Sequence, residues 1–137
     1  MFLLDTNVLS ETLRPQPDPG VMHGLERHRR ELSTAAPVIH EILFGALRIP
    51  PGARREAALQ EIEHVFLKTL DVLPYDRLAA EWHARQRARL TDEGRTPPFV
   101  DGQIAAIAAI NGLTLVTHKV TDFAAFEGLT VEDWFAG

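Results

Sequence analysis

Short apolar runs alternate along the chain with longer segments of helical periodicity. Apolar or β-branched runs bounded by turn residues predict buried strands at residues 2–4, 32–35, 72–73, 113–117 and 129–131. Between them, apolar residues recur at helical spacing over residues 19–30, 38–47, 54–68, 76–90 and 100–110. This alternation favours an α/β fold, in which helices cover both faces of a mainly parallel sheet.

Local signals support the predicted helix ends. Asp18 is a candidate N-cap with Pro19 at the first helical position, and Asp76 is a candidate cap for a later helix. Pro50 and the residues after it end the helix before them, and Gly112 marks another helix stop.

The length of 137 residues suits one domain, and neither a linker nor an internal repeat divides the chain, so we assign residues 1–137 to one domain. No apolar run approaches the roughly 20 residues that cross a bilayer. The apolar start runs directly into Asp5, which is unlike a secretion signal. The absence of cysteine excludes disulfides and thiolate sites. We expect a cytoplasmic protein without membrane association.

The formal net charge is −5, which argues against a surface that is basic throughout and made for nucleic acid. It does not exclude a nuclease, because carboxylates that bind divalent cations make the bare sequence acidic and the bound metal reverses the local sign.

Two acids follow predicted strands. Asp5 comes directly after the first strand and is followed by Thr6 and Asn7, while Asp122 follows the fourth strand in a predicted loop. Because the carboxyl ends of parallel strands share one edge of a sheet, these residues are expected to lie together. The simpler alternatives are that Asp5 caps the next helix and that Asp122 forms a turn.

Two further acids occur within apolar helices. Glu41 is a lone acid beside Ile42 and Leu43, which suggests partial burial, and a buried carboxylate is costly unless it is paired or metal-bound. Asp101 lies in the first turn of a very apolar helix, where a favourable interaction with the helix dipole is the alternative explanation.

Taken together, four carboxylates suit a hard cation such as Mg²⁺ or Mn²⁺, which can orient a water and neutralise charge on a phosphodiester. Competing catalytic patterns are missing from the sequence: it has no cysteine nucleophile, no G-x-S-x-G elbow and no H-E-x-x-H pair.

The chain resembles the PIN-domain family and, within it, the VapC-type toxins, FitB-like members included. The resemblance rests on residues 3–11 (LLDTNVLSE), 41–45 (EILFG), 101–106 (DGQIAA), 115–117 (LVT) with Asp122-Phe123, and 129–135 near the end. These motifs occur in order over nearly the whole chain.

The resemblance implies a five-stranded parallel sheet and an acidic pocket made by Asp5, Glu41, Asp101 and Asp122. It further implies Mg²⁺- or Mn²⁺-dependent endoribonuclease activity. Thr117, with Thr6 or Asn7, would support the pocket by hydrogen bonding.

The chain departs from the family at Lys119, where Asn or Asp is usual, and at His118, where Arg is frequent. Lys119 brings a cation near the expected metal, where it would contact substrate phosphate, pair with Asp122 or weaken metal binding. Arg95 precedes Asp101 closely and is a candidate phosphate contact, with a solvated helix face as the alternative.

The resemblance also implies partners. A VapB-like antitoxin would neutralise the chain, in a homodimer or higher assembly that reaches promoter DNA only through the antitoxin. Phe44, Leu47 and Leu59 are candidates for antitoxin or homodimer contacts, with core packing as the alternative. Two other functions stay open: a FitB-like binding module that regulates a promoter with little or no nuclease activity, and a PIN nuclease of RNA maturation.

Overall fold

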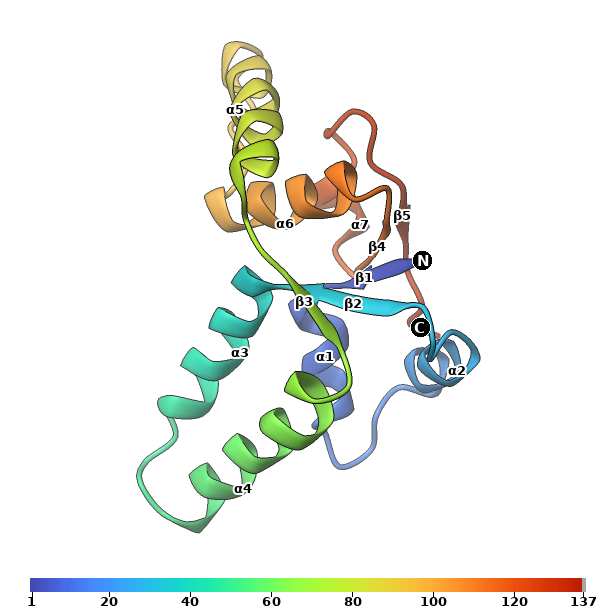
Figure 1. Cartoon of the computed structure of the whole chain (residues 1–137), viewed down its shortest axis with the longest axis vertical. Coiled ribbons are helices and arrows are strands. Elements are labelled where there is room, and N and C mark those ends of the chain that lie inside the picture. Colours follow the sequence, from blue (N-terminus) through green and yellow to red (C-terminus); the bar gives the residue numbers. More distant parts are fainter. Residues whose placement is uncertain (137) are drawn as a thin grey trace.

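A parallel sheet of five short strands, in the order β3–β2–β1–β4–β5, runs through the centre of the chain (Figure 1). The structure is a computed structural model that describes residues 1–136. The strands are β1 (Phe2–Leu4), β2 (Leu32–Ala35), β3 (Asp71–Leu73), β4 (Thr114–Val116) and β5 (Val131–Glu132). Every pairing between neighbouring strands is parallel, which confirms the predicted fold class.

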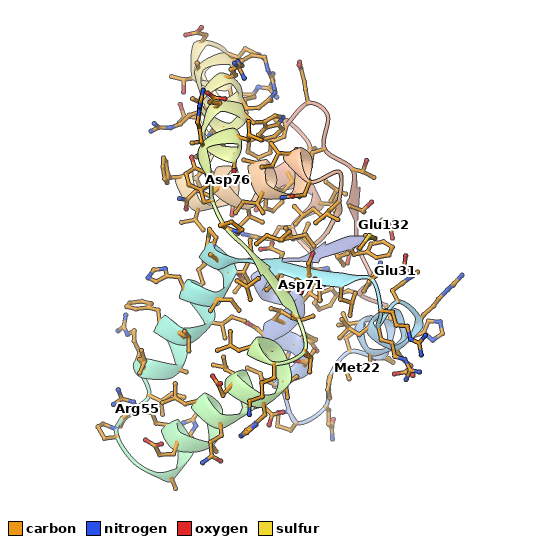
Figure 2. All side chains as sticks on the ribbon, viewed as in Figure 1. Met22, Glu31, Arg55, Asp71, Asp76 and Glu132 are labelled. Carbon is orange, nitrogen blue, oxygen red and sulfur yellow. The ribbon has the colours of Figure 1, made fainter. Side chains whose placement is uncertain are left out.

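Helices cover both faces of this sheet. They are α1 (Thr6–Thr12), α2 (Pro19–Arg27), α3 (Ala36–Leu47), α4 (Ala53–Glu61), the π-helical η1 (Ile62–Leu67), α5 (Arg77–Asp92), α6 (Phe99–Ile110) and α7 (Val120–Phe123). In Figure 1, α1, α3 and α4 lie on one side of the sheet and α6 and α7 on the other. Helix α5 packs against α6 and extends away from the sheet. Figure 2 shows this departure between Asp71, in β3, and Asp76, at the base of α5.

The helix ends follow the predicted capping residues. The Asp18 carboxylate accepts a hydrogen bond from Val21 N at 3.0 Å, and the Asp76 carboxylate accepts one from Ala79 N at 3.0 Å. Each bond satisfies a donor that the first helical turn leaves unpaired, which explains why α2 and α5 begin where they do.

The helix expected over residues 54–68 is present, as α4 followed directly by η1, but its second part is π-helical and buries Ile62 and Phe66. One other part of the prediction was wrong. The segment around Asp122 is not a loop, because it forms the short helix α7, whose Phe123 is fully buried.

The core lies between the central strands and the helices on either side. Leu3, Leu4, Leu115 and Val116 of the two central strands are fully buried, as is the whole of 104–108 in α6. Phe44 and Leu47, by contrast, are 55% and 48% exposed, so core packing does not explain these two side chains. Within residues 1–136, no helix combines the length and apolar character that a membrane span requires.

Candidate functional site

The register of β1 and β4 brings Asp5 and Thr117 together. Leu4 pairs with Val116, and Asp5 N donates to the Val116 carbonyl at 3.0 Å. The next residue after each strand therefore stands at the same edge of the sheet. Asp5 is 1% exposed, and Thr117 Oγ1 donates to its Oδ2 at 2.8 Å.

Two further donors hold the Asp5 carboxylate. Thr6 N donates to Oδ1 at 2.7 Å, and Asn7 Nδ2 donates to Oδ2 at 3.1 Å. Asp5 thus caps α1, as the simpler of its two interpretations predicted. The other two donors, Asn7 and Thr117, hold its carboxylate at the edge of the sheet. The cap and a site role are compatible in this geometry.

Thr117 is the centre of this network. Its fully buried hydroxyl oxygen accepts from Asn7 Nδ2 at 3.1 Å and from Lys119 N at 3.0 Å, in addition to donating to Asp5. Asn7 Oδ1 accepts from His118 N at 2.9 Å. These bonds join the segment after β1 to the segment after β4.

Glu41 reaches the same region from α3. Thr6 Oγ1 donates to Glu41 Oε1 at 2.8 Å. The expected partial burial of Glu41 was wrong, because α3 turns Val38, Ile42 and Ala46 toward the core and leaves Glu41 exposed. Glu41 and Thr6 stand at one end of a groove of about 360 Å³ between α1, α3 and α4.

Asp101 and Asp122 complete the acid cluster, by which we mean Asp5, Glu41, Asp101 and Asp122. Asp101 lies in the first turn of α6 and is 7% exposed, and Asp122 lies exposed in α7. Lys119 Nζ is 3.3 Å from Asp101 Oδ1. An ion pair between Lys119 and Asp122 was one of three alternatives for this lysine; the structure shows the pair with Asp101 instead, although Asp122 still attracts the ammonium.

The burial of Asp5 and Asp101 favours a cation beside their carboxylates. Desolvation raises the pKa of Asp5 and Asp101 above the ordinary value, even though hydrogen bonding from Thr117 and attraction to Lys119 act in the opposite direction. Burial disfavours the charged form of Lys119, yet attraction to Asp101 and Asp5 raises the pKa of Lys119 overall. The buried carboxylates are stabilised by positive charge.

The donor set fits a hard divalent cation in its chemistry, since carboxylate oxygens are the ligands that Mg²⁺ and Mn²⁺ prefer. The Lys119 ammonium shows that the cluster already attracts a cation. As they stand, no three acidic or histidine side chains within residues 1–136 converge closely enough to hold an ion. Binding of a divalent ion would therefore require these carboxylates to move closer together.

Comparison with known proteins places this arrangement in a family. The profile of the PIN domain matches residues 2–129. The chain belongs to the PIN-domain family. This PIN domain is 30% identical over 133 residues to the tRNA(fMet)-specific endonuclease VapC of Shigella flexneri, covering 97% of each chain. It is 31% identical over 137 residues to toxin FitB of Neisseria gonorrhoeae, covering 98% of this chain and 99% of that one.

Solved structures agree with the sequence relatives. The PIN domain matches a chain of FitAB bound to a DNA fragment with a TM-score of 0.90 and 29% identity, covering 100% of this chain and 98% of that one. It matches a chain of DNA-bound VapBC from Salmonella typhimurium with a TM-score of 0.86 and 28% identity, covering 97% of each.

Arg95 is the predicted site residue that the PIN domain does not bring to the acid cluster. Its guanidinium is 2.6 Å from Glu93 Oε1 in the segment after α5. Its contact with substrate phosphate stays a prediction without support from this geometry. Thr6, Asn7, Thr117 and Lys119, in contrast, all bond within the network around Asp5 and Asp101.

Asp133 is a residue near the site that sequence reasoning missed. Its Oδ2 is 3.0 Å from Nδ1 of His118, whose ring packs against Phe135 with the centroids 4.2 Å apart. The last strand, expected at residues 129–131, lies at Val131–Glu132 instead, so the acid that directly follows it is Asp133. The predicted strand end would have indicated Glu132, which is why Asp133 was not singled out.

Proposed function

We propose that this PIN domain is a Mg²⁺- or Mn²⁺-dependent endoribonuclease and the toxin of a toxin–antitoxin pair. The observation that carries the proposal is that Asp5 and Asp101, 96 positions apart, are both buried and are linked through Lys119. Lys119 Nζ is 3.3 Å from Asp101 Oδ1, and Lys119 N donates to the Thr117 hydroxyl that holds the Asp5 carboxylate. Relatives named as VapC ribonucleases and endonucleases support RNA as the substrate.

Different residues of the chain would hold the metal, orient its ligands and contact the RNA. Asp5, Glu41, Asp101 and Asp122 would hold the cation, and a bound divalent ion lowers the pKa of a water and offsets charge on the phosphodiester. Thr117, Asn7 and Thr6 hold the Asp5 carboxylate in one orientation. Lys119, 46% exposed, offers a positive charge that a phosphate of the RNA can approach.

The test is cleavage of a cellular RNA pool by the purified chain, freed of any co-purifying antitoxin, with Mg²⁺, with Mn²⁺ and with EDTA. Asp101→Asn keeps the size of the side chain, removes its charge, and is expected to lower cleavage by about 100-fold or more. Asp92→Asn, at the exposed end of α5, is the matched control and should cut normally. Well-folded protein that cuts with no metal, or equally as Asp101→Asn, would contradict the proposal.

We further propose that an antitoxin segment lies in the groove between α1, α3 and α4. This groove is lined by apolar residues such as Ile42, Ala46 and Ile62, and also by the charged Glu41 and Arg54. An apolar segment that places a cation beside Glu41 would suit it. The solved VapBC and FitAB complexes, which contain similar chains, support an antitoxin partner.

A substitution at Gly45 tests whether the antitoxin binds in this groove. A Cβ added at Gly45 meets nothing within 4 Å, so Gly45→Arg should fill the groove without disturbing the core. Capture of the product of the neighbouring gene should weaken at least tenfold in Gly45→Arg and stay normal in Gln60→Arg, an exposed position of α4. Equal capture by both variants would place the partner elsewhere.

A binding module without nuclease activity is the second candidate. The observation that favours it is the Lys119–Asp101 ion pair, which already neutralises part of the acid cluster. If the module binds only, antitoxin capture and the DNA binding of the complex should survive Asp101→Asn, while no preparation cuts RNA.

A further inference from the structure

A second pocket, which we call the edge pocket, opens at the carboxyl edge of the sheet and shares no lining residue with the groove between α1, α3 and α4. Its volume is about 300 Å³, at the lower end of the roughly 300–1,000 Å³ of small-molecule pockets. Residues of α3, of the segment after β3 and of α6 line it: Ala36, Pro37, His40, Tyr75, Val100 and Gln103.

The strand order places the edge pocket next to the acid cluster. Ala36 directly follows β2 and Tyr75 lies two residues after the end of β3, whereas Asp5 directly follows β1. Because these strands are parallel and stand in the order β3–β2–β1, the pocket and the cluster are neighbours along one edge of the sheet. Val100 of the pocket also directly precedes Asp101 of the cluster.

The aromatic rings of the edge pocket are held in place by their neighbours. The Tyr75 hydroxyl is 2.8 Å from Nδ1 of His83, which is 2% exposed. The first turn of α6 packs on the same histidine so closely that a Cβ at Gly102 would collide with its ring. The His40 ring lies alongside that of Phe44, with the planes 25° from parallel and the centroids 6.2 Å apart. The pocket is therefore formed before a ligand binds.

The lining of the edge pocket suits a flat, uncharged ligand. Its lining residues, all in the part of the chain that the structure describes, include no acid, lysine or arginine that could hold a metal ion or a phosphate. The rings of His40 and Tyr75 and the amide of Gln103 offer stacking and hydrogen bonds instead. Nucleobases in single-stranded RNA bind in this way, because they stack on aromatic side chains and are recognised by hydrogen bonds to their edges.

We propose that the edge pocket binds one nucleobase of single-stranded RNA, beside the phosphate that lies at the acid cluster. His40 and Tyr75 stack on the base, and the Gln103 amide, which has a donor and an acceptor side by side, distinguishes one base from another. This inference rests on the proposed function, since it names what the same site selects in its substrate. It makes Gln103 a residue that determines specificity.

The test is the binding of neutral nucleosides (adenosine, guanosine, cytidine and uridine) to the full chain in EDTA, followed by the NMR signals of the Val100 methyl groups. These nucleosides carry no phosphate, so neither the acid cluster nor a metal takes part in their binding. We expect the Val100 signals to shift in a saturable way with at least one nucleoside.

Four variants place this binding in the edge pocket. His40→Ala removes an exposed ring, and Gln103→Leu removes the amide at similar size. His23→Ala in α2 and Gln60→Leu in α4, both at exposed positions, are the matched controls. Nucleoside binding should weaken by about fivefold or more in each pocket variant and stay normal in the controls.

No shift with any nucleoside, or equal binding by the wild type and both pocket variants, would overturn the inference. RNA cleavage by the same preparations separates this result from the proposed function. Nucleoside binding that the pocket variants lose, in a chain that cuts no RNA with Mg²⁺ or Mn²⁺, contradicts the nuclease and keeps the pocket. Metal-dependent cleavage without nucleoside binding overturns the pocket and leaves the ribonuclease in place.

Discussion

Replacing the Thr117 hydroxyl tests the network that holds Asp5. Thr117→Val keeps the shape of the side chain but removes one donor to Asp5 and the acceptor used by Asn7 Nδ2 and Lys119 N. The position is fully buried, so water cannot easily replace these partners. The variant therefore loses three hydrogen bonds without opening a cavity.

The magnitude follows from the kinds of bond that are lost. A neutral hydrogen bond contributes about 1 kcal/mol and one to a charged group about 1.5–3 kcal/mol. Because Asp5 and Asn7 keep a bond to each other, we expect the free energy of unfolding to fall by about 2–4 kcal/mol. For a domain of this size that lowers Tm by roughly 8–16 °C. The pKa of Asp5 should also rise further, since the bond from Thr117 lowers it.

Urea unfolding and thermal unfolding of the purified chain measure this loss. Thr117→Ser keeps the hydroxyl and should retain most of the stability, and Thr121→Val changes an exposed threonine in the same segment and should be nearly neutral. If Thr117→Val unfolds within about 0.5 kcal/mol of the wild type, the three bonds do not hold the site together and the reasoning fails.

Gly24→Ala would bring a Cβ to 2.5 Å from Cε3 of Trp134, so we expect urea unfolding to show a loss of about 1–3 kcal/mol. Gly45→Ala, with open space around the added methyl, should gain about 0.5–1 kcal/mol, and the opposite order would refute the packing of the C-terminal segment on α2. Burial lowers the pKa of His83, with repulsion from Arg87 adding to the effect, so the unfolded chain takes up a proton at higher pH than the folded chain. Stability linked to His83 is therefore complete above about pH 6.5 and falls as the pH drops through that value. His83→Gln, which keeps a partner for the Tyr75 hydroxyl 2.8 Å away, should lose this part of the pH dependence in urea titrations, and an unchanged slope would show that His83 does not titrate as argued.

Much of the fold could be predicted from the sequence, because strand starts and helix caps depend on a few neighbouring residues. The strand at Phe2–Leu4 and the helices capped by Asp18 and Asp76 begin where the sequence predicted. The parallel sheet then makes the residues after β1 and β4 neighbours, so the meeting of Asp5 and Thr117 also followed from the pattern. Asp5 and Asp122 were named because they follow strands, and Glu41 and Asp101 because they are acids within apolar helices. The supporting roles of Thr6, Asn7 and Thr117 came only from the resemblance to the PIN-domain family.

Other features depend on how elements pack, and periodicity carries no information about that. Glu41 is exposed because of the rotation of α3 against the core, which apolar neighbours in the sequence do not reveal. The continuation of α4 as a π-helical segment, in which Ile62 and Phe66 are buried, is likewise not visible in the apolar period. Asp133 reaches His118 only because β5 is placed beside β4.

The sequence by itself determined which residues end the strands and begin the helices, since capping, apolar period and turn chemistry act over a few neighbouring residues. Only the tertiary structure decided which charges meet. Lys119 and Asp101 are 18 positions apart and come from different elements, yet their ion pair sets the charge of the acid cluster. Such pairs depend on strand register and helix rotation, because a charged side chain acts over a few ångströms in space, whatever the distance along the chain.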